Sequence, residues 1–139
     1  MHVEADRIIP VGAEIAEQRL GSTLRRLEAK GRVTVGPTDS VAKMVRLRTG
    51  GPRTIGRTAI RPLRWQPTGV TAGWFPSLDA RLALTSVDAT TSMLSLSGTY
   101  WPPFGPLGRA VHRAGRGDRV AHRTVASFLE ELAAEMRGG

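Results

Sequence analysis

Hydrophobic and polar residues alternate along several stretches of the chain, and this period of two is typical of β-strands that are buried on one face. Residues 2–9 read HVEADRII and predict a first strand, which Pro10 ends because proline cannot donate to a ladder. Four more stretches alternate in the same way: 41–48, 55–65, 78–84 and 93–100. Turn segments rich in Gly, Pro and Asp separate these stretches, so we expect an antiparallel sheet.

Helical patterns occupy two other parts of the chain. Residues 11–20 and 23–30 are helical in composition, but Gly21 and Ser22 separate them, and Ser22 suits the N-cap of a second helix. We therefore expect two short helices here rather than one long one. Residues 119–137 predict a longer helix, because apolar side chains recur at gaps of three and four and form one stripe: Ala121, Val125, Phe128 and Leu132.

A stiff apolar segment, YWPPFGPLG at Tyr100–Gly108, joins the last strand to this helix. Pro102 ends the strand at Trp101, and Pro106 suits the first turn of a following helix. A rigid corner sets the direction of the helix. The pattern predicts an α+β, helix-grip fold: a curved antiparallel β-sheet wrapped around a long C-terminal helix, with two short helices after the first strand.

Length and composition set the class of protein. The chain has 139 residues and 40% hydrophobic residues, which suits a single domain spanning 1–139 with one core. Its apolar runs are only a few residues long, so we expect no transmembrane segment. The start, MHVEADRIIP, does not have the pattern of a signal peptide. Cysteine is absent, which excludes disulfides. We expect a cytoplasmic protein.

Residue patterns typical of catalysis or metal binding are sparse. His2, His112 and His122 form neither HxxxH nor HExxH, so we expect no metal site and no cofactor. There is no GxSxG elbow and no phosphate-binding glycine loop. Asp79 alternates away from its apolar neighbours and has Arg81 two residues on, so we expect a surface ion pair rather than an acid catalyst. We therefore assign no catalytic residue.

Four segments carry a resemblance to a known family. They are PLRWQPTG at 62–69, WFPSLDARLAL at 74–84, LSGTYWPPFGPLGRAVHR at 96–113 and HRTVASFLEELA at 122–133. Together with the order of elements, they resemble the START-like superfamily, also called SRPBCC or polyketide cyclase-like, and in particular an uncharacterised branch seen in actinobacteria. The pattern departs from the branch at Gly115-Arg116-Gly117, which interrupts a helix that relatives continue.

This resemblance implies an apolar cavity between the sheet and the C-terminal helix. Members of the superfamily bind hydrophobic small molecules there, and some are cyclases or dehydratases. We expect a lipid- or polyketide-like ligand and a monomer or homodimer, with a cyclase- or dehydratase-type enzyme as the alternative. Tyr100 is the expected polar contact. The predicted ligand-binding wall comprises Val45, Leu47, Ile60, Trp65, Leu82, Leu84, Leu94, Leu96, Tyr100, Val125, Phe128 and Leu132.

The arginine content raises a second alternative. Net charge is +8, and 18 of the 20 basic residues are arginine. Alternation puts Arg46 and Arg48 on one face of their strand, and Arg57 and Arg61 on the face of the next strand opposite Ile60. If the strands align these four arginines, the outer face of the sheet binds an anion or a nucleic acid. The favoured interpretation is a solvated face without a nucleic-acid partner, because no aromatic residues are interleaved for base stacking.

Overall fold

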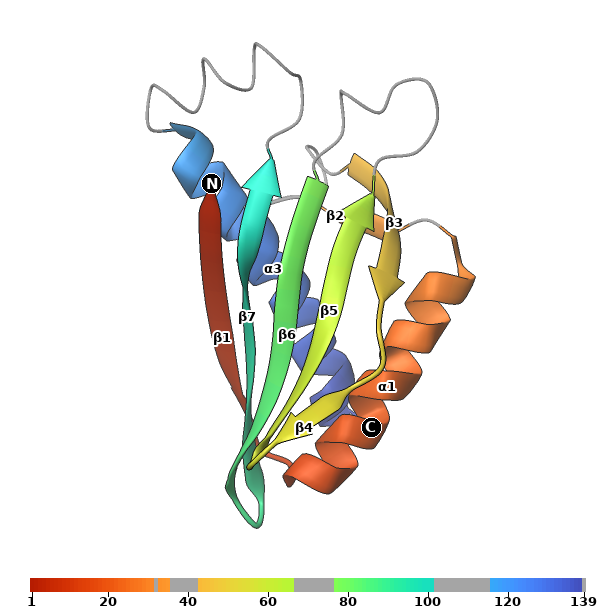
Figure 1. Cartoon of the computed structure of the whole chain (residues 1–139), viewed down its shortest axis with the longest axis vertical. Helices are drawn as coiled ribbons and strands as arrows, with labels where there is room; N and C mark the ends of the chain where they lie inside the picture. Colours follow the sequence, from red (N-terminus) through yellow and green to blue (C-terminus); the bar gives the residue numbers. More distant parts are fainter. Residues whose placement is uncertain (32, 36–42, 67–76, 102–115, 139) are drawn as a thin grey trace.

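The computed structural model describes residues 1–31, 33–35, 43–66, 77–101 and 116–138 (Figure 1). Seven strands and two helices make up this part of the chain. In chain order they are β1 (His2–Ile9), α1 (Ala13–Ala29), β2 (Val33–Val35), β3 (Lys43–Thr49), β4 (Arg53–Ile55), β5 (Thr58–Gln66), β6 (Ser77–Asp88), β7 (Thr91–Trp101) and α3 (Arg116–Gly138).

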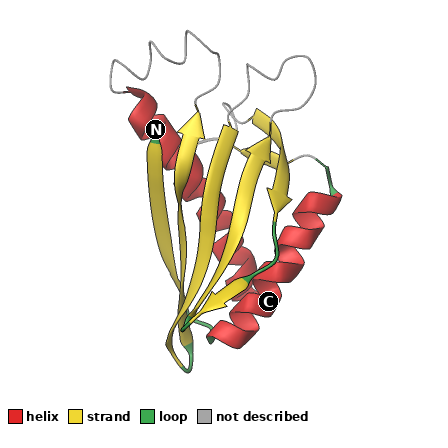
Figure 2. Ribbon diagram, in the orientation of Figure 1, coloured by secondary structure: helices red, strands yellow, loops and turns green. Residues whose placement is uncertain are grey.

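The strands form one curved antiparallel sheet in the order β1-β7-β6-β5-β3-β2, and β4 pairs with β5 beside this path. Both helices lie on one face, which we call the inner face, and the other is the outer face (Figure 2). The outer face is turned toward the viewer in Figure 1. α3 crosses the sheet and packs mainly against β1, whereas α1 packs against β3 and β6. The predicted α+β, helix-grip architecture is confirmed.

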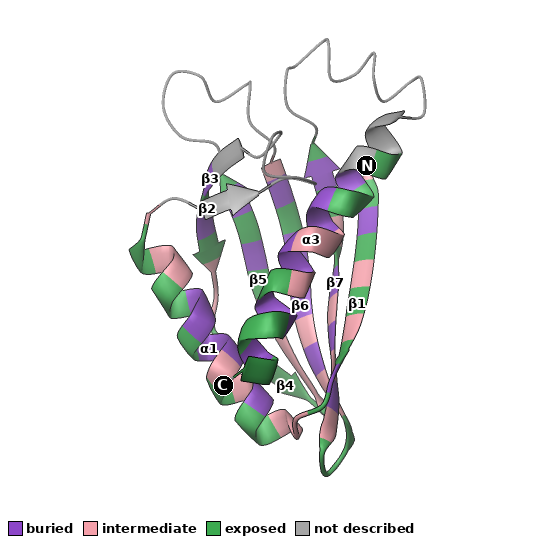
Figure 3. Ribbon diagram, turned by 180° about the vertical axis from the view of Figure 1, so that it is seen from behind, coloured by how far each residue is buried: buried purple, intermediate pink, exposed green. Residues whose placement is uncertain are grey.

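Buried and exposed residues alternate along the central strands of the sheet (Figure 3). In β6, Leu78 and Leu82 are buried, whereas Asp79 and Arg81 between them are exposed. The register places Leu82 beside Leu96 of β7, so the buried positions of neighbouring strands form rows across the inner face. The inward faces predicted for β3, β6 and β7 are confirmed by their buried residues.

The prediction of two short helices after the first strand is wrong. The structure has one helix of 17 residues, α1, which continues through Gly21 and Ser22. Glycine inside a helix costs about 1 kcal/mol relative to alanine. Burying Leu20 and Leu24 on either side of it contributes about 1.5–3 kcal/mol each, so packing outweighs the propensity. The predicted end of the helix is confirmed, since Lys30 is the C-cap and Gly31 follows with φ 75°.

The apolar stripe predicted for the C-terminal helix is confirmed. Val125, Phe128 and Leu132 are buried against the sheet, and Arg123 is exposed on the other side of α3. β7 ends at Trp101, as predicted. The proline-rich corner itself, from Pro102 onward, lies outside the described residues, so its role in directing the helix stays a prediction.

Polar contacts fix both helices in place. Arg7 of β1 donates from Nε to Oε2 of Glu130 on α3 at 2.7 Å, and Arg19 of α1 donates to the Met136 carbonyl at 2.6 Å. The Glu28 carboxylate accepts from the Thr49 hydroxyl at 2.9 Å, which ties the end of α1 to β3. Within the described ranges, no helix combines the length and apolar character that crossing a membrane requires.

Candidate functional site

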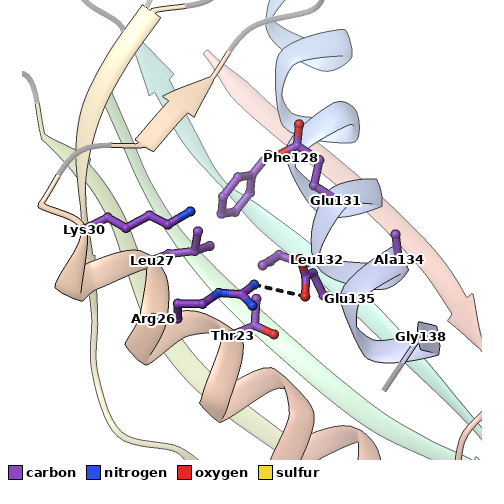
Figure 4. A pocket seen from close by; sticks show the side chains of 10 residues that line it. All are labelled: Thr23, Arg26, Leu27, Lys30, Phe128, Glu131, Leu132, Ala134, Glu135 and Gly138. Carbon is purple, nitrogen blue, oxygen red and sulfur yellow. Dashed lines mark ion pairs between the residues drawn. The ribbon is translucent and has the colours of Figure 1, made fainter.

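A groove lies between the C-terminal halves of α1 and α3 (Figure 4). Its volume is 640 Å³, within the range of about 300–1,000 Å³ that is usual for small-molecule sites. Leu27, Phe128 and Leu132 give it apolar surface, and the Phe128 ring points between the two helices. The residues around it are Thr23, Arg26, Leu27, Lys30, Phe128, Glu131, Leu132, Ala134, Glu135 and Gly138.

The rim of the groove is charged, with opposite signs on the two helices. Arg26 and Lys30 lie on the α1 side, and Glu131 and Glu135 lie on the α3 side. Arg26 Nη2 pairs with Glu135 Oε2 at 3.0 Å, and the pair spans the space between the helices (Figure 4). Because both side chains are about half exposed, this pair stabilises the fold little and can open at small cost.

A cluster of three aromatic side chains lies against the groove. Trp65 from β5 meets Phe128 of α3 edge-on, with ring centroids 5.2 Å apart, and meets Tyr100 of β7 edge-on at 6.3 Å. Phe128 therefore belongs both to the groove and to the cluster. Trp65 is 1% exposed, and its indole Nε1 has no hydrogen-bond partner in the described part of the protein. An unsatisfied buried donor costs about 1–3 kcal/mol, so this N–H would gain from any acceptor that reaches it.

Tyr100 supplies a second polar group in the cluster. Burial raises its pKa to about 12, and a hydrogen bond with the Thr124 side chain opposes the rise. The phenol is therefore neutral at physiological pH and can donate a hydrogen bond. With this pKa, it is a poor general base.

The structure brings together eleven of the twelve residues predicted to line the cavity. They are buried in one continuous core between the sheet and the two helices: Val45, Leu47, Trp65, Leu82, Leu84, Leu94, Leu96, Tyr100, Val125, Phe128 and Leu132. Ile60 is the exception, and the prediction that it lines the cavity is wrong. It pairs with Ala83, and it lies on the outer face, because its neighbour Arg61 pairs with the inward-facing Leu82. An outward side chain cannot line a space under the helix.

The prediction that Arg61 belongs to the outer face is also wrong, because this residue of β5 lies on the inner face. Its guanidinium pairs with the Glu17 carboxylate of α1, and its side chain is only 11% exposed. A Cβ at Gly21 would lie 3.4 Å from Arg61 Nη2, which is close to ordinary van der Waals contact, so the guanidinium packs against this turn of α1. Two atoms of the pair, Arg61 Nε and Glu17 Oε2, have no partner among the described residues.

The patch of four arginines predicted for the outer face therefore has different members. Arg46 and Arg48 are exposed there, as expected. Arg57 lies in the turn between β4 and β5, and Arg61 faces inward. The register adds Arg64, which lies directly opposite Arg48, to the outer face.

Residues from α1 were missing from the predicted site. Thr23, Leu27 and Lys30 reach the groove only because α1 continues past Gly21 and lies beside α3. The spacing of Leu20, Leu24 and Leu27 along one helical face was the available signal, and the break assumed at Gly21 hid its continuity.

The remaining candidates for chemistry were the histidines and Asp79. His122 is on an exposed position of α3. Asp79 forms a surface ion pair, as expected, but its partner is Arg64 on the neighbouring strand, at 3.3 Å. The described residues contain no group of three or more His, Asp or Glu side chains that could hold a metal ion. His112 lies outside the described residues.

Comparison with known proteins supports the fold and goes no further. No family model matches the chain, and no curated protein matches it significantly. A hypothetical protein from Helicobacter pylori is similar in structure, with a TM-score of 0.56 and 10% identity over 99% of this chain and 88% of that one. A conserved protein from Geobacillus kaustophilus has a TM-score of 0.57 and 10% identity over 98% of this chain and 95% of that one. An aromatase/cyclase from a Streptomyces species, 12% identical over 98% of this chain and 93% of that one, has a TM-score of only 0.39. At these identities the likeness shows the helix-grip fold alone.

Proposed function

We propose that this protein is a START-like domain that binds a hydrophobic small molecule of lipid or polyketide type between α1, α3 and the inner face of the sheet. The observation that carries the proposal is the contact between the groove and the aromatic cluster. Phe128 lines a space of ligand size and touches Trp65, whose buried N–H has no partner among the described residues.

The surface of the groove favours an amphipathic ligand. Leu27, Phe128 and Leu132 offer apolar contact; Phe128 and Leu132 are already buried, so the gain at these two residues comes from packing of the ligand against them rather than from removing their surface from water. Arg26 and Glu135 at the rim are about half exposed and offer charged groups to a polar end of the ligand. An apolar body with a polar end satisfies both requirements.

The aromatic cluster indicates which polar atom the apolar part of the ligand should contain. Phe128 lines the groove and contacts Trp65, so we infer that a ligand reaches the indole by displacing the Phe128 ring. There, an acceptor oxygen would accept a hydrogen bond from the Trp65 N–H, worth about 1 kcal/mol or more. We therefore infer a ligand with a carbonyl, ether or hydroxyl oxygen rather than a pure hydrocarbon.

Binding rather than catalysis is the favoured role. The cluster holds one titratable group, Tyr100, and its pKa of about 12 keeps it protonated. A cyclase or dehydratase needs a group whose pKa lies near the working pH. Turnover of a poly-β-ketone substrate that disappears in Tyr100→Phe would favour the enzyme alternative over a binding protein.

Two matched probes test the proposal. Fluorene and fluorenone have the same rigid apolar shape, and only fluorenone carries an acceptor oxygen. We expect both to bind, with fluorenone about tenfold tighter, since one hydrogen bond is worth about 1–1.5 kcal/mol. Trp65→Phe keeps an aromatic ring and removes the N–H, so it should erase the preference and leave fluorene binding unchanged. Trp101→Phe on the outer face is the matched control and should change neither affinity.

Two results would count against this assignment in different ways. If neither probe binds, and native mass spectrometry of protein purified from its own host finds no apolar molecule, the binding function is wrong. If both bind equally and Trp65→Phe has no effect, the groove binds ligands but Trp65 does not choose among them. The indole N–H resonance, assigned by its loss in Trp65→Phe, should move when fluorenone is added and stay in place with fluorene.

A further inference from the structure

The outer face of the sheet gathers arginines on one side. Register places Arg48 of β3 beside Arg64 of β5, with Arg46 two residues along β3 on the same face. Arg81 of β6 lies in the next row, opposite Pro62, and Arg53 of β4 lies opposite Ile60. Neighbouring strands are about 4.8 Å apart and alternate residues of one strand about 6.8 Å apart, so these side chains share one surface. We call Arg46, Arg48, Arg53, Arg64 and Arg81 the arginine face.

These arginines differ from those on the helix side in how they are neutralised. On the helix side, four arginines have a carboxylate within ion-pair distance: Arg7, Arg26, Arg61 and Arg137. Of the arginine face, only Arg64 has one, and its pair with Asp79 is long, 3.3 Å, and more than half exposed on the arginine side. Arg46, Arg48, Arg53 and Arg81 form no ion pair with any described residue. A cluster of unpaired positive charge attracts anions and releases counterions when one binds.

An aromatic side chain lies on the same face. Trp101 ends β7 and pairs with Ser77 on β6, on the side of the sheet opposite the buried Tyr100. It is 49% exposed, although tryptophan is usually well buried. The next outward position of β6 after Ser77 is Asp79, which lies beside its partner Arg64, so Trp101 lies at one end of the arginine face rather than among its unpaired arginines. A half-exposed indole there can stack on a nucleic-acid base, and such stacking tolerates any base. This supplies the aromatic contact that the sequence pattern did not indicate on the arginine strands.

The opposite edge of the outer face limits where an anion can lie. Glu4 and Asp6 are exposed on β1, opposite Ser97 and Ser95 of β7. Their negative charge repels phosphates. The favourable surface therefore runs over β3, β5 and β6 to the end of β7 at Trp101.

We propose that the arginine face, together with Trp101, binds single-stranded nucleic acid. A single strand exposes both phosphates, which arginine recognises, and unpaired bases, which stack on an indole. A duplex hides its bases, and this face carries no described helix or ribbon to enter a groove. An acidic peptide would use the arginines and gain little from Trp101. This activity is independent of the groove, because it uses the other face of the sheet.

Fluorescence anisotropy with a labelled oligothymidylate of about twelve nucleotides tests the proposal, since single-strand sites span about 4–16 nucleotides. We expect binding at about 50 mM salt, with log K falling against log salt with a slope of about −2 to −3, as three or four phosphate contacts require. The double variant Arg46→Glu/Arg48→Glu should weaken binding at least about tenfold. The control Arg119→Glu/Arg123→Glu changes the charge equally at exposed positions of α3 and should weaken it less than about threefold.

Trp101 separates nucleic acid from other polyanions. Trp101→Ala should weaken oligothymidylate binding at least about fivefold, and Trp101→Phe should retain most of it. Polyglutamate, heparin and vesicles with anionic lipid serve as competing probes. The proposal is overturned if oligothymidylate does not bind, if the two charge doubles weaken it equally, or if Trp101→Ala has no effect. Tighter binding of a competing probe would also overturn the nucleic-acid assignment. Circular dichroism of every variant checks that the fold is kept.

Discussion

Arg61 and Arg64 lie on the same strand, β5, but on opposite faces, and each forms an ion pair of a different kind. Arg61 faces inward, with 11% of its side chain exposed, and pairs with Glu17, which is 27% exposed. Arg64 faces outward, with 58% exposed, and pairs with Asp79, which is 50% exposed. The Arg61–Glu17 pair is mostly shielded from water, whereas the Arg64–Asp79 pair is hydrated. We therefore expect a guanidinium–carboxylate pair to affect the free energy of unfolding differently at the two positions.

The largest effect is expected from breaking the inner pair. Arg61→Ala leaves the Glu17 carboxylate without its partner in a poorly hydrated place, and we expect a loss of about 3 kcal/mol in the free energy of unfolding. Glu17→Ala should cost a similar amount. Replacing both partners by leucine removes both desolvated charges, so the double variant should be close to the wild type. Urea denaturation measures all three variants.

The proposed difference between the inner and outer ion pairs is wrong if Arg61→Ala and Glu17→Ala each lower the free energy of unfolding by less than about 1 kcal/mol. The inner pair would then behave like an ordinary surface pair. The proposed difference is also wrong if the double leucine variant is as unstable as the single ones. In that case Arg61 and Glu17 would act through shape rather than through charge.

The titration of Tyr100 gives a second measure of how far the inner face is shielded from water, and its expected effect on stability is smaller. Burial raises the pKa of Tyr100 from 10.0 to about 12. Because the folded pKa exceeds the unfolded one, the tyrosine's contribution to stability is present below about pH 10 and is lost as pH rises toward 12. The loss reaches at most about 2–3 kcal/mol above pH 12.

Tyr100 is the only tyrosine in the sequence, so the ultraviolet absorbance of tyrosinate reports its ionisation directly. Tyr100→Phe is the matched control: it should remove the absorbance change and the extra loss of stability above pH 10. Ionisation near pH 10 in the folded protein would mean that the phenol is hydrated, and the inner face would not be as dry as its burial indicates.

Alternation predicted the two faces well where it was unambiguous. In β6 and β7, leucines and small polar residues alternate without conflict, and the structure follows them. In β5, the pattern contains a conflict: Ile60 and Trp65 cannot share a face in a regular strand, because they are an odd number of positions apart. Hydrophobicity placed Ile60 inside and Arg61 outside. The structure does the opposite, since Leu63 and Trp65 set the inward face and Arg61 finds Glu17 on α1.

The candidate site was only partly predictable for a related reason. Burial follows from local patterns, so most of the predicted wall is in the core. A groove depends instead on how two helices lie relative to each other, which no local pattern contains. Likewise, the unsatisfied N–H of Trp65 is a property of its surroundings and not of its position in the sequence. The single-domain and cytoplasmic expectations stay predictions.

The smallest effect on stability is expected from breaking the outer pair, Arg64–Asp79. A double-mutant cycle of Arg64→Ala and Asp79→Ala should give a coupling below about 0.5 kcal/mol, because water and salt screen two half-exposed side chains. Raising the salt concentration from about 0.1 M to 1 M should remove the remaining coupling, since the Debye length falls from about 10 Å to 3 Å. A coupling above about 2 kcal/mol would show that the outer face is shielded from water, for example by a second copy of the chain. In that case Arg64 would not be available to a nucleic acid.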